Sequence, residues 1–461
     1  MSLEDLRNIL LNVADSGIKF ARDMSVPSAE IYVISQSLTT VSDNNGKIDS
    51  RDGIVQGAGI RVAVGKQLGF ASCTGFEDDA IKGAIEQAHK IARRSPENPM
   101  FPGFIPEIKA AKEGILDPEI INLDADLLSK EFDSISEGVD RTDQRIVSFS
   151  MGLNSTWQGY AIATTEGCLT SSLLTTYGGN ASIVVMGEGD RKTAFDFKTR
   201  REITPLAGLG KTTVDKALKG LGAKPFEGTE VLPTIWGSIE VGGFLTDALS
   251  LRMLGSAFVE QSNPWKDKLE QEVANKNFTL TDEGQKPEYA ETQAIDHEGT
   301  PMRSTTLIEK GILKTFLFNR MFGHAAGKDT TGNCKRGGGI LGGGVSFETA
   351  PAIGPNKVLV ANVSKSLDEQ IAEIDKGILV AGLPLGLFVS SNPITGDFSL
   401  TSNEAFLIRS GEIAYPLKPV SIAGNYPESI MNALFIGSDR EKTFWPIDAP
   451  TMTFPKHTIT S

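Results

Sequence analysis

The order of helical and strand patterns predicts an α+β fold. Helical patterns open the chain and recur between groups of strands instead of alternating with single strands. Strands joined by short turns pair antiparallel, whereas a strict alternation of strand and helix is typical of a parallel sheet. The run GAKPFEGTE at residues 222–230 is typical of a linker, and strand-rich sequence dominates beyond it. We therefore expect two domains, over residues 1–222 and 230–461.

Helices of the first domain are predicted from apolar residues that recur with the helical period. In the first helix, Leu3, Leu6, Leu10, Val13 and Ala14 form one apolar stripe. The second helix is followed by closely spaced prolines, which cannot continue a helix. The helices are expected over residues 3–22, 78–94, 117–139 and 206–221.

Strands of the first domain are predicted from turn residues between β-rich runs. Asn45-Gly46 divides residues 29–50 into a hairpin, and Gly65-Lys66 divides residues 59–73 into a second hairpin. Residues 144–203 are expected to form four or five strands. The turns between them are placed at glycine-containing groups, at residues 164–167, 178–180 and 187–189.

The second domain is expected to begin with a helix that contains EVGGFLTDAL, residues 240–249, and runs to about Leu254. Strands follow, with glycine-rich breaks at residues 337–344 and 392–397. A later helix is predicted from the capping box between Ser366 and Glu369.

The composition is ordinary for a globular chain and excludes several classes of function. Of the 461 residues, 40% are hydrophobic and 22% are charged, which suffices for large buried cores. The net charge of −13 repels phosphates, so we expect no direct contact with nucleic acid. The three cysteines form no CxxC pair, which favours free thiols in a reducing compartment.

No segment is expected to enter or cross a membrane. The first residues, MSLEDLRNILL, carry acids and lack the long apolar core of a signal peptide. The most apolar run, residues 377–391, is interrupted by Pro384 and is too short to span a bilayer. We therefore expect a cytoplasmic protein.

The residues by themselves predict no catalytic site. The run GGGILGGGVS lacks the GK[ST] of a phosphate-binding loop, and we interpret it as a mobile loop or as a place where a substrate backbone approaches closely.

The four histidines, His89, His297, His324 and His457, lie too far apart for one helix to present two of them to a metal. We expect His89 to be structural, His297 to lie in a loop between strands, and His457 to be exposed. The sequence also lacks a GxSxG nucleophile elbow.

Several long segments resemble the TldD/PmbA family, once called modulators of DNA gyrase. In the first half, the similar segments are SLTTVSDNNGKID and GIVQGAGIRVAVGKQLGFAS, within residues 37–72. In the second half they are DHEGTPMRSTTLIEKGILKTFLFNR (296–320), TTGN (330–333) and NPITGDFSLTSNEAFLIRSGEIAYPLKPVSIAGN (392–425). The resemblance implies an N-terminal α+β domain with an antiparallel sheet, and a C-terminal domain with a curved, barrel-like β-sheet plus helices.

The resemblance also implies a metal site whose residues this chain lacks. TldD-type subunits carry HExxxH on the first helix of the C-terminal domain and a cysteine near the C-terminus, which hold zinc, with the glutamate as general base. Here Gly242, Gly243 and Asp247 stand at the positions of that motif, and residues 435–448 contain no cysteine. We therefore expect no metal in this chain, and we interpret the two glycines as a close approach to another helix, such as a helix of a partner.

This pattern resembles the PmbA/TldE branch of the family. The resemblance implies a TldD-like paralogous subunit that holds the zinc, and a groove between the two chains where an unfolded peptide is cut. This chain would supply strand edges and glycine loops to the groove wall. A homodimer is possible when the chain is alone. The groove residues that we infer are Gly338, Gly339, Gly342, Gly343, Asn392, Gly396 and Asp397.

Two other functions stay open from the sequence. The chain can be a stand-alone peptidase with an atypical site that uses Asp247, His297 or His324. It can also be a regulatory binding protein of the gyrase-modulator type, without proteolysis. The acidic charge argues against contact with DNA but not against contact with a protein.

Overall fold

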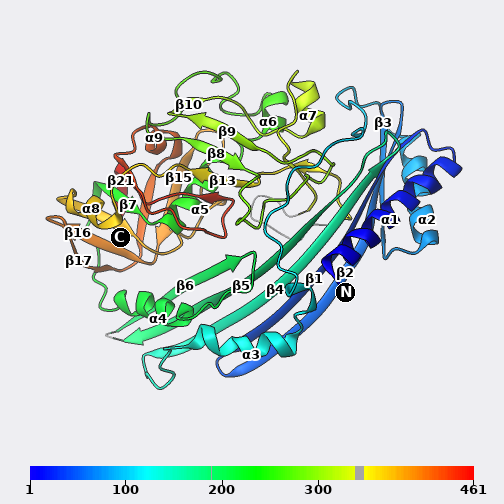
Figure 1. Cartoon of the computed structure of the whole chain (residues 1–461). Helices are drawn as coiled ribbons and strands as arrows, with labels where there is room; N and C mark the ends of the chain where they lie inside the picture. The colour runs from blue at the N-terminus through cyan, green and yellow to red at the C-terminus, as the bar shows by residue number, and fades with distance from the viewer. Residues whose placement is uncertain (188, 338–346) are drawn as a thin grey trace.

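The computed structural model describes residues 1–187, 189–337 and 347–461, and it confirms the α+β class (Figure 1). The first half of the chain forms one antiparallel sheet with the strand order β3-β2-β1-β4-β5-β6. The strands are β1 (Ser28–Asn44), β2 (Lys47–Val64), β3 (Gln67–Thr74), β4 (Ile146–Thr164), β5 (Leu169–Gly187) and β6 (Asp190–Arg200). The hairpin turns expected at residues 45–46 and 65–66 are both present, between β1 and β2 and between β2 and β3.

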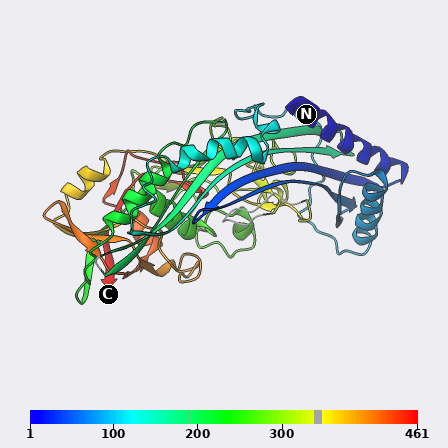
Figure 2. The same cartoon turned by 90° about the horizontal axis from the view of Figure 1, so that it is seen from below.

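Helices pack on one face of this sheet, and the second half of the chain packs on the other. Figure 2 shows the long strands curving under α1, α3 and α4. Because side chains alternate along a strand, Ile31 and Val33 of β1 join the core under the helices, whereas Tyr32 and Ile34 pack against Ile295. The helices are α1 (Leu3–Asp23), α2 (Asp78–Ala92), α3 (Ala125–Ser136) and α4 (Leu209–Lys219), with a short 3₁₀ helix at Ile120–Asn122.

Two expectations for the first half were wrong. Residues 146–200 form three long strands, because β5 continues through Gly178 and Gly179 without a turn. A Cβ on Gly178 would lie 2.8 Å from the carbonyl oxygen of Lys198, so this glycine permits close packing within the sheet. The helix expected over residues 117–139 is divided, because the Asp124 side chain accepts a hydrogen bond from the Leu127 N–H and starts α3.

The second half of the chain contains two mixed sheets around a central helix, α5 (Ser238–Leu249). The larger sheet has the order β15-β18-β21-β7-β14-β16-β17, and β19 pairs with β21. Its strands are β7 (Thr229–Trp236), β14 (Lys376–Val380), β15 (Asp397–Ser402), β16 (Ala405–Arg409), β17 (Glu412–Leu417), β18 (Val420–Asn425), β19 (Phe435–Ile436) and β21 (Met452–Thr460). In the described residues β15 and β17 do not pair with each other, so the barrel-like closure of this sheet is not confirmed.

The second sheet has the order β10-β9-β8-β13-β20, and a separate pair joins β11 to β12. These strands are β8 (Leu280–Glu283), β9 (Ser304–Glu309), β10 (Ile312–Leu313), β11 (Cys334–Lys335), β12 (Ala352–Ile353), β13 (Lys357–Val360) and β20 (Ile447–Asp448). The shorter helices are α6 (Gly255–Val259), α7 (Arg320–Ala325), α8 (Leu367–Ala372) and α9 (Tyr426–Met431), and α8 starts at the capping box predicted from Ser366 and Glu369. None of the described helices is both long enough and apolar enough to cross a membrane.

Helix α5 lies inside the core of the second half. Every residue from Glu240 to Leu249 is buried, and its apolar side chains pack with strands of both sheets. A helix that is buried on all sides carries no polar face, which is why its sequence lacks a clear amphipathic stripe. It ends at Leu249, earlier than expected, and the Ser250 hydroxyl then donates to the carbonyl oxygen of Asp247.

Candidate functional site

The window of the expected metal motif lies on α5, and the chain itself fills it. A Cβ on Gly242 would lie 2.7 Å from the carbonyl oxygen of Ile447 and 3.0 Å from Cδ1 of Trp445. A Cβ on Gly243 would lie 2.9 Å from Cζ2 of Trp445 and 3.0 Å from Cδ1 of Leu387. The glycines therefore admit the indole of Trp445 and the backbone of β20. Our expectation of a neighbouring helix was wrong, because the close approach comes from the C-terminal segment of this same chain.

Asp247, the third residue of the window, is held by three hydrogen bonds. Its Oδ2 accepts from the Tyr426 hydroxyl at 2.7 Å and from the Phe388 N–H at 3.0 Å. Its Oδ1 accepts from the Ser391 hydroxyl at 3.0 Å. The side chain is 6% exposed, and a buried carboxylate with this number of donors is well satisfied. Asp247 thus ties α5 to α9 and to the segment before residues 392–397.

The residues of the window do not fit a zinc ion. Zinc takes nitrogen, sulfur or oxygen donors, and neither Gly242 nor Gly243 supplies one. The space where a side chain would begin is occupied by Trp445 and Ile447, and the Asp247 oxygens already accept hydrogen bonds. In the parts of the chain that the structure describes, no group of three or more His, Cys, Asp or Glu side chains is placed to hold a metal ion.

The turn at residues 392–397 lies beside this window, which the sequence did not indicate. The buried Arg252 follows α5 and donates to the carbonyl oxygens of Pro393 at 3.1 Å and Ile394 at 3.0 Å. Asn392 and Asp397 are exposed at the surface of the turn. Gly396 is buried with a φ of +87°, and a Cβ there would lie 2.4 Å from Cδ of Pro427. The structure therefore brings three of the inferred groove residues close to Asp247.

The side chains in this turn are occupied with one another. The Asn392 Oδ1 accepts from the N–H groups of Ile394 at 2.9 Å and Thr395 at 3.1 Å. The Asp397 carboxylate accepts from the Thr395 hydroxyl at 2.7 Å and from the Asn425 amide at 2.9 Å. These hydrogen bonds fix the shape of the turn. The other inferred groove residues, Gly338, Gly339, Gly342 and Gly343, lie outside the described residues.

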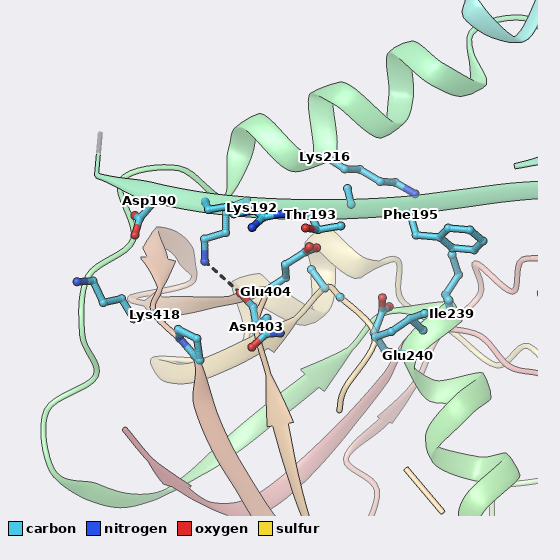
Figure 3. Close-up of a pocket in the computed structure, with 16 residues that line it drawn as sticks. Asp190, Lys192, Thr193, Phe195, Lys216, Ile239, Glu240, Asn403, Glu404 and Lys418 are labelled. Carbon is cyan, nitrogen blue, oxygen red and sulfur yellow. Dashed lines mark hydrogen bonds between the residues drawn. The ribbon is translucent and has the colours of Figure 1, made fainter. Parts of the chain in front are cut away.

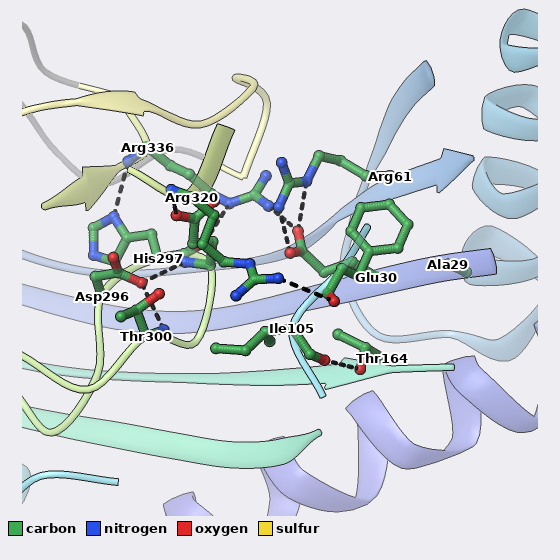
Figure 4. A network of polar contacts seen from close by, with 12 residues as sticks. Ala29, Glu30, Arg61, Ile105, Thr164, Asp296, His297, Thr300, Arg320 and Arg336 are labelled. Carbon is green, nitrogen blue, oxygen red and sulfur yellow. Dashed lines mark hydrogen bonds and ion pairs between the residues drawn. The ribbon is translucent and has the colours of Figure 1, made fainter. Parts of the chain in front are cut away.

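A second polar centre joins the two halves of the chain, and sequence reasoning missed it (Figure 4). Glu30 of β1 is fully buried and pairs with Arg61 of β2 and with Arg336, which directly follows β11. Burial alone would raise the pKa of the Glu30 carboxyl, but the two guanidinium groups outweigh it and lower this pKa. The available signal was the charge of Glu30 within the otherwise apolar run of residues 29–34.

His297 lies at the same centre, in a turn between strands as expected, but it is buried. Its Nδ1 accepts from the Arg336 N–H at 2.8 Å, so the proton of the neutral ring is on Nε2. The ring packs edge-on against Tyr160, with centroids 4.9 Å apart. Burial, and then the charges of Lys335 and Arg336, hold the pKa of His297 well below its usual value. The ring is therefore neutral and inaccessible to a substrate.

Asp296 and Glu298 flank His297 and are buried with it. Asp296 accepts from the N–H groups of Glu298, Thr300 and Cys334 at 2.8–3.0 Å. Burial, and then the neighbouring Glu298, raise the pKa of Asp296 to about 8. The Glu298 carboxyl accepts from the Arg320 N–H at the start of α7. This cluster fixes the backbone of the DHEGTP segment.

The remaining histidines do not join these centres. His324 is exposed on α7, and His89 is partly buried on α2. His457 is buried, so our expectation of an exposed side chain was wrong. Its ring lies between the hydroxyls of Thr234 at 2.7 Å and Ser429 at 2.9 Å, because β21 is a central strand of the larger sheet. In the described contacts, Asp247, His297 and His324 do not touch one another.

Comparison with known proteins identifies the family. Residues 229–461 match the family described as PmbA/TldA metallopeptidase C-terminal domain, and residues 29–92 match PmbA/TldA metallopeptidase domain 1. The chain is 24% identical to a metalloprotease PmbA homologue of Haemophilus influenzae, with 90% of this chain and 88% of the relative covered. It is 23% identical to metalloprotease PmbA of Escherichia coli O157:H7, with 95% and 93% covered.

The fold agrees with that result. The crystal structure of TldE from Thermococcus kodakarensis superposes with a TM-score of 0.83 at 25% sequence identity, and it covers 98% of this chain and 99% of that chain. The sequence segments, the family match over the second half and the superposition of the whole chain agree with one another. The chain belongs to the TldD/PmbA family of metallopeptidase-like proteins.

Proposed function

We propose that this chain is the non-catalytic, PmbA/TldE-like subunit of a heterodimeric zinc peptidase that cuts unfolded peptides in the cytoplasm. In this proposal a TldD-like paralogous subunit holds the zinc and supplies the general base. The chain described here contributes to the wall of the peptide groove and completes the enclosure. This chain itself supplies no catalytic residue for the hydrolysis.

The observation that carries the proposal is the filled window on α5. The positions of the two expected histidines and the glutamate are occupied by Gly242, Gly243 and Asp247. The space for any side chain at the two glycines is taken by Trp445 and the backbone of Ile447. A zinc site requires several donors and an open position for water. Gly242 and Gly243 supply no donor, and the oxygens of Asp247 already accept hydrogen bonds.

An exposed strand edge supports a role in holding an extended peptide. In the part of the chain that the structure describes, β3 pairs with residues 57–64 of β2, and residues 47–56 extend beyond it along the outer edge of the sheet. All ten residues from 47 to 56 are exposed. Backbone groups on an unpaired edge can hydrogen-bond an added strand, either from a peptide or from a partner subunit.

The test is to mix the purified chain with the TldD-type subunit of the same genome and to follow cleavage of fluorescein-labelled casein. We expect no cleavage by this chain alone, little by the partner alone, and rapid cleavage by the mixture. The control is a mixture in which the HExxxH glutamate of the partner is replaced by glutamine, and this mixture should be inactive. Full activity of the partner without this chain would contradict the proposal.

Zinc analysis separates this proposal from a stand-alone peptidase. We expect well below one zinc per chain for the protein purified alone, and about one zinc per heterodimer for the mixture. Alanine substitution of Asp247, His297 or His324 provides the second distinction. If the chain alone cleaved casein, and if one of these substitutions abolished that cleavage, the atypical peptidase would replace the proposed subunit.

A further inference from the structure

A cavity of about 490 Å³ lies between the two halves of the chain, next to the start of α5 (Figure 3). Strand β6 and helix α4 form one wall, and α5 with the turns before β16 and β18 forms the other. Its volume is in the range of pockets that hold small ligands. The cavity is separate from the filled window, because Gly242 and Gly243 do not line it.

Two glutamates reach this cavity from different elements. Glu240 comes from the first turn of α5, and Glu404 comes from the turn between β15 and β16. Glu240 is only 7% exposed, and Glu404 is partly buried. Within the described residues neither carboxylate forms an ion pair, and neither accepts a hydrogen bond from another residue. A buried carboxylate without a partner is costly, so an occupant that supplies donors would be favoured here.

Arg191, Lys192, Lys216 and Lys418 line the cavity, and within the described residues none of them forms an ion pair with Glu240 or Glu404. Two of them, Lys192 and Lys216, are committed to other acceptors. Lys192 of β6 donates to the carbonyl oxygens of Asn403 at 3.0 Å and Leu417 at 3.2 Å. Lys216 of α4 forms an ion pair with Asp196 at 2.8 Å. Their charges act on the two glutamates from a distance, but their donors point to other acceptors. The carboxylates therefore keep their hydrogen-bonding capacity for a ligand.

The protonation of the two acids agrees with this arrangement. Burial raises the pKa of Glu240 to about 7, although its own peptide N–H and Lys216 oppose the effect. Burial and then the charge of Glu240 raise the pKa of Glu404 to about 7. A cation placed between the two acids would lower both pKa values and would remove their mutual repulsion.

We propose that this cavity binds a primary ammonium group of a peptide, held between the carboxylates of Glu240 and Glu404. An ammonium group has three donors that can diverge toward acceptors on two walls. A guanidinium is a flat fork that suits one carboxylate in a single plane. A metal ion is a poorer fit, since the described residues contain no group of three suitable ligands.

The apolar part of the lining fits the stem of such a group. Phe195, Ile239 and Leu383 lie beside the two acids, and Phe195 is 40% exposed. Methylene groups next to an ammonium can cover these surfaces while the charge reaches the carboxylates. The ammonium can belong to a free amino terminus or to a lysine side chain. The site therefore selects charge and shape in a peptide and does not require the partner subunit of the proposed function.

The binding test uses the full-length chain alone, so its outcome does not depend on peptidase activity. Three peptides are titrated at about pH 8 by isothermal calorimetry: Ala-Leu-Ala-amide with a free amino terminus, acetyl-Ala-Lys-Ala-amide, and acetyl-Ala-Leu-Ala-amide. We expect the peptides with an ammonium group to bind at least about tenfold more tightly than the capped peptide without lysine. Binding of the first alone assigns the amino terminus, and binding of the second alone assigns lysine. Equal binding of all three peptides, or of none, would overturn the inference.

Substitutions of the two cavity glutamates test whether the peptide binds in this cavity. Glu240→Gln and Glu404→Gln should each weaken binding of the preferred peptide by at least about tenfold. The matched control is Glu441→Gln, which removes the same charge from an exposed residue that acts on Glu240 but does not line the cavity. It should leave the affinity within about threefold of the original value. Unchanged affinity in both cavity variants would overturn the inference. A cavity that binds Ca²⁺ from CaCl₂ but no peptide, and loses the Ca²⁺ in Glu240→Gln, would overturn it as well.

Discussion

One helix carries two buried acids whose surroundings differ completely. Asp247, near the end of α5, accepts three hydrogen bonds from Tyr426, Phe388 and Ser391. Glu240, in the first turn of the same helix, faces a cavity and receives no hydrogen bond from another residue within the described chain. Burial alone therefore does not identify a functional acid. Asp247 stabilises the fold, whereas Glu240 retains capacity for a ligand.

The largest effect is expected at Asp247. Asp247→Ala would leave the Tyr426 hydroxyl, the Ser391 hydroxyl and the Phe388 N–H without their acceptor. We expect the free energy of unfolding to fall by about 3–5 kcal/mol, because several buried donors lose their partner at once. Urea denaturation followed by tryptophan fluorescence measures this change. A loss below about 1 kcal/mol would show that Asp247 does not hold α5 in place.

A smaller loss is expected when the filled window is overpacked. Gly242→Ala places a methyl group 2.7 Å from the Ile447 carbonyl oxygen, which is backbone and cannot rotate away. We expect a loss of about 1–3 kcal/mol in the free energy of unfolding. The matched control is Gly83→Ala on α2, where a Cβ meets nothing within 4 Å. That variant should gain about 0.5–1 kcal/mol, and similar shifts in both variants would refute the tight contact on α5.

Substitution of Glu240 should change the free energy of unfolding in the opposite direction to substitution of Asp247. The pKa of Glu240 is about 7 in the folded chain against 4.5 in the unfolded chain, so the folded state binds the proton more tightly. The ionised carboxylate therefore destabilises the fold above about pH 7, and the cost disappears as the pH falls below about 4.5. Glu240→Gln should raise the free energy of unfolding by roughly 1–3 kcal/mol at about pH 8 and by much less at about pH 5. Equal shifts at the two pH values would contradict the raised pKa.

The smallest effect is expected from a metal chelator. The window on α5 is closed by Trp445 and Ile447, and nothing in its geometry depends on a metal. Incubation of the chain with EDTA should leave its melting temperature unchanged, because no binding energy is lost. A fall of several degrees that added zinc restores would mean that the chain binds metal at a site other than this window.

Sequence reasoning succeeded where local residues decide the structure. Asn45-Gly46 and Gly65-Lys66 specified their hairpins, because these turns need residues that tolerate a positive φ. Ser366 and Glu369 specified the start of α8 for a similarly local reason, since the two side chains cap each other's backbone. It failed at Gly178 and Gly179, where glycine permits close packing in mid-strand and was interpreted as a turn.

Only part of the candidate site could be predicted from the sequence. The absence of metal donors at Gly242 and Gly243 is visible in the sequence, because donor chemistry is a property of the residue type. The prediction that His457 is exposed was wrong. Its position near the end of the sequence does not reveal that β21 lies in the middle of the larger sheet. The ion pairs of Glu30 with Arg61 and Arg336 join residues from distant segments and were not predicted.

The α+β class, the local turns and caps, the family resemblance and the lack of metal donors at Gly242 and Gly243 follow from the residues alone. The position of Trp445 beside Gly242 and Gly243 follows from packing between distant segments. The same packing gives Asp247 its hydrogen-bond donors and leaves Glu240 facing a cavity. Residue type sets which chemistry is possible at a position. Packing between distant segments then sets which groups are buried, which find partners and which keep a cavity in front of them.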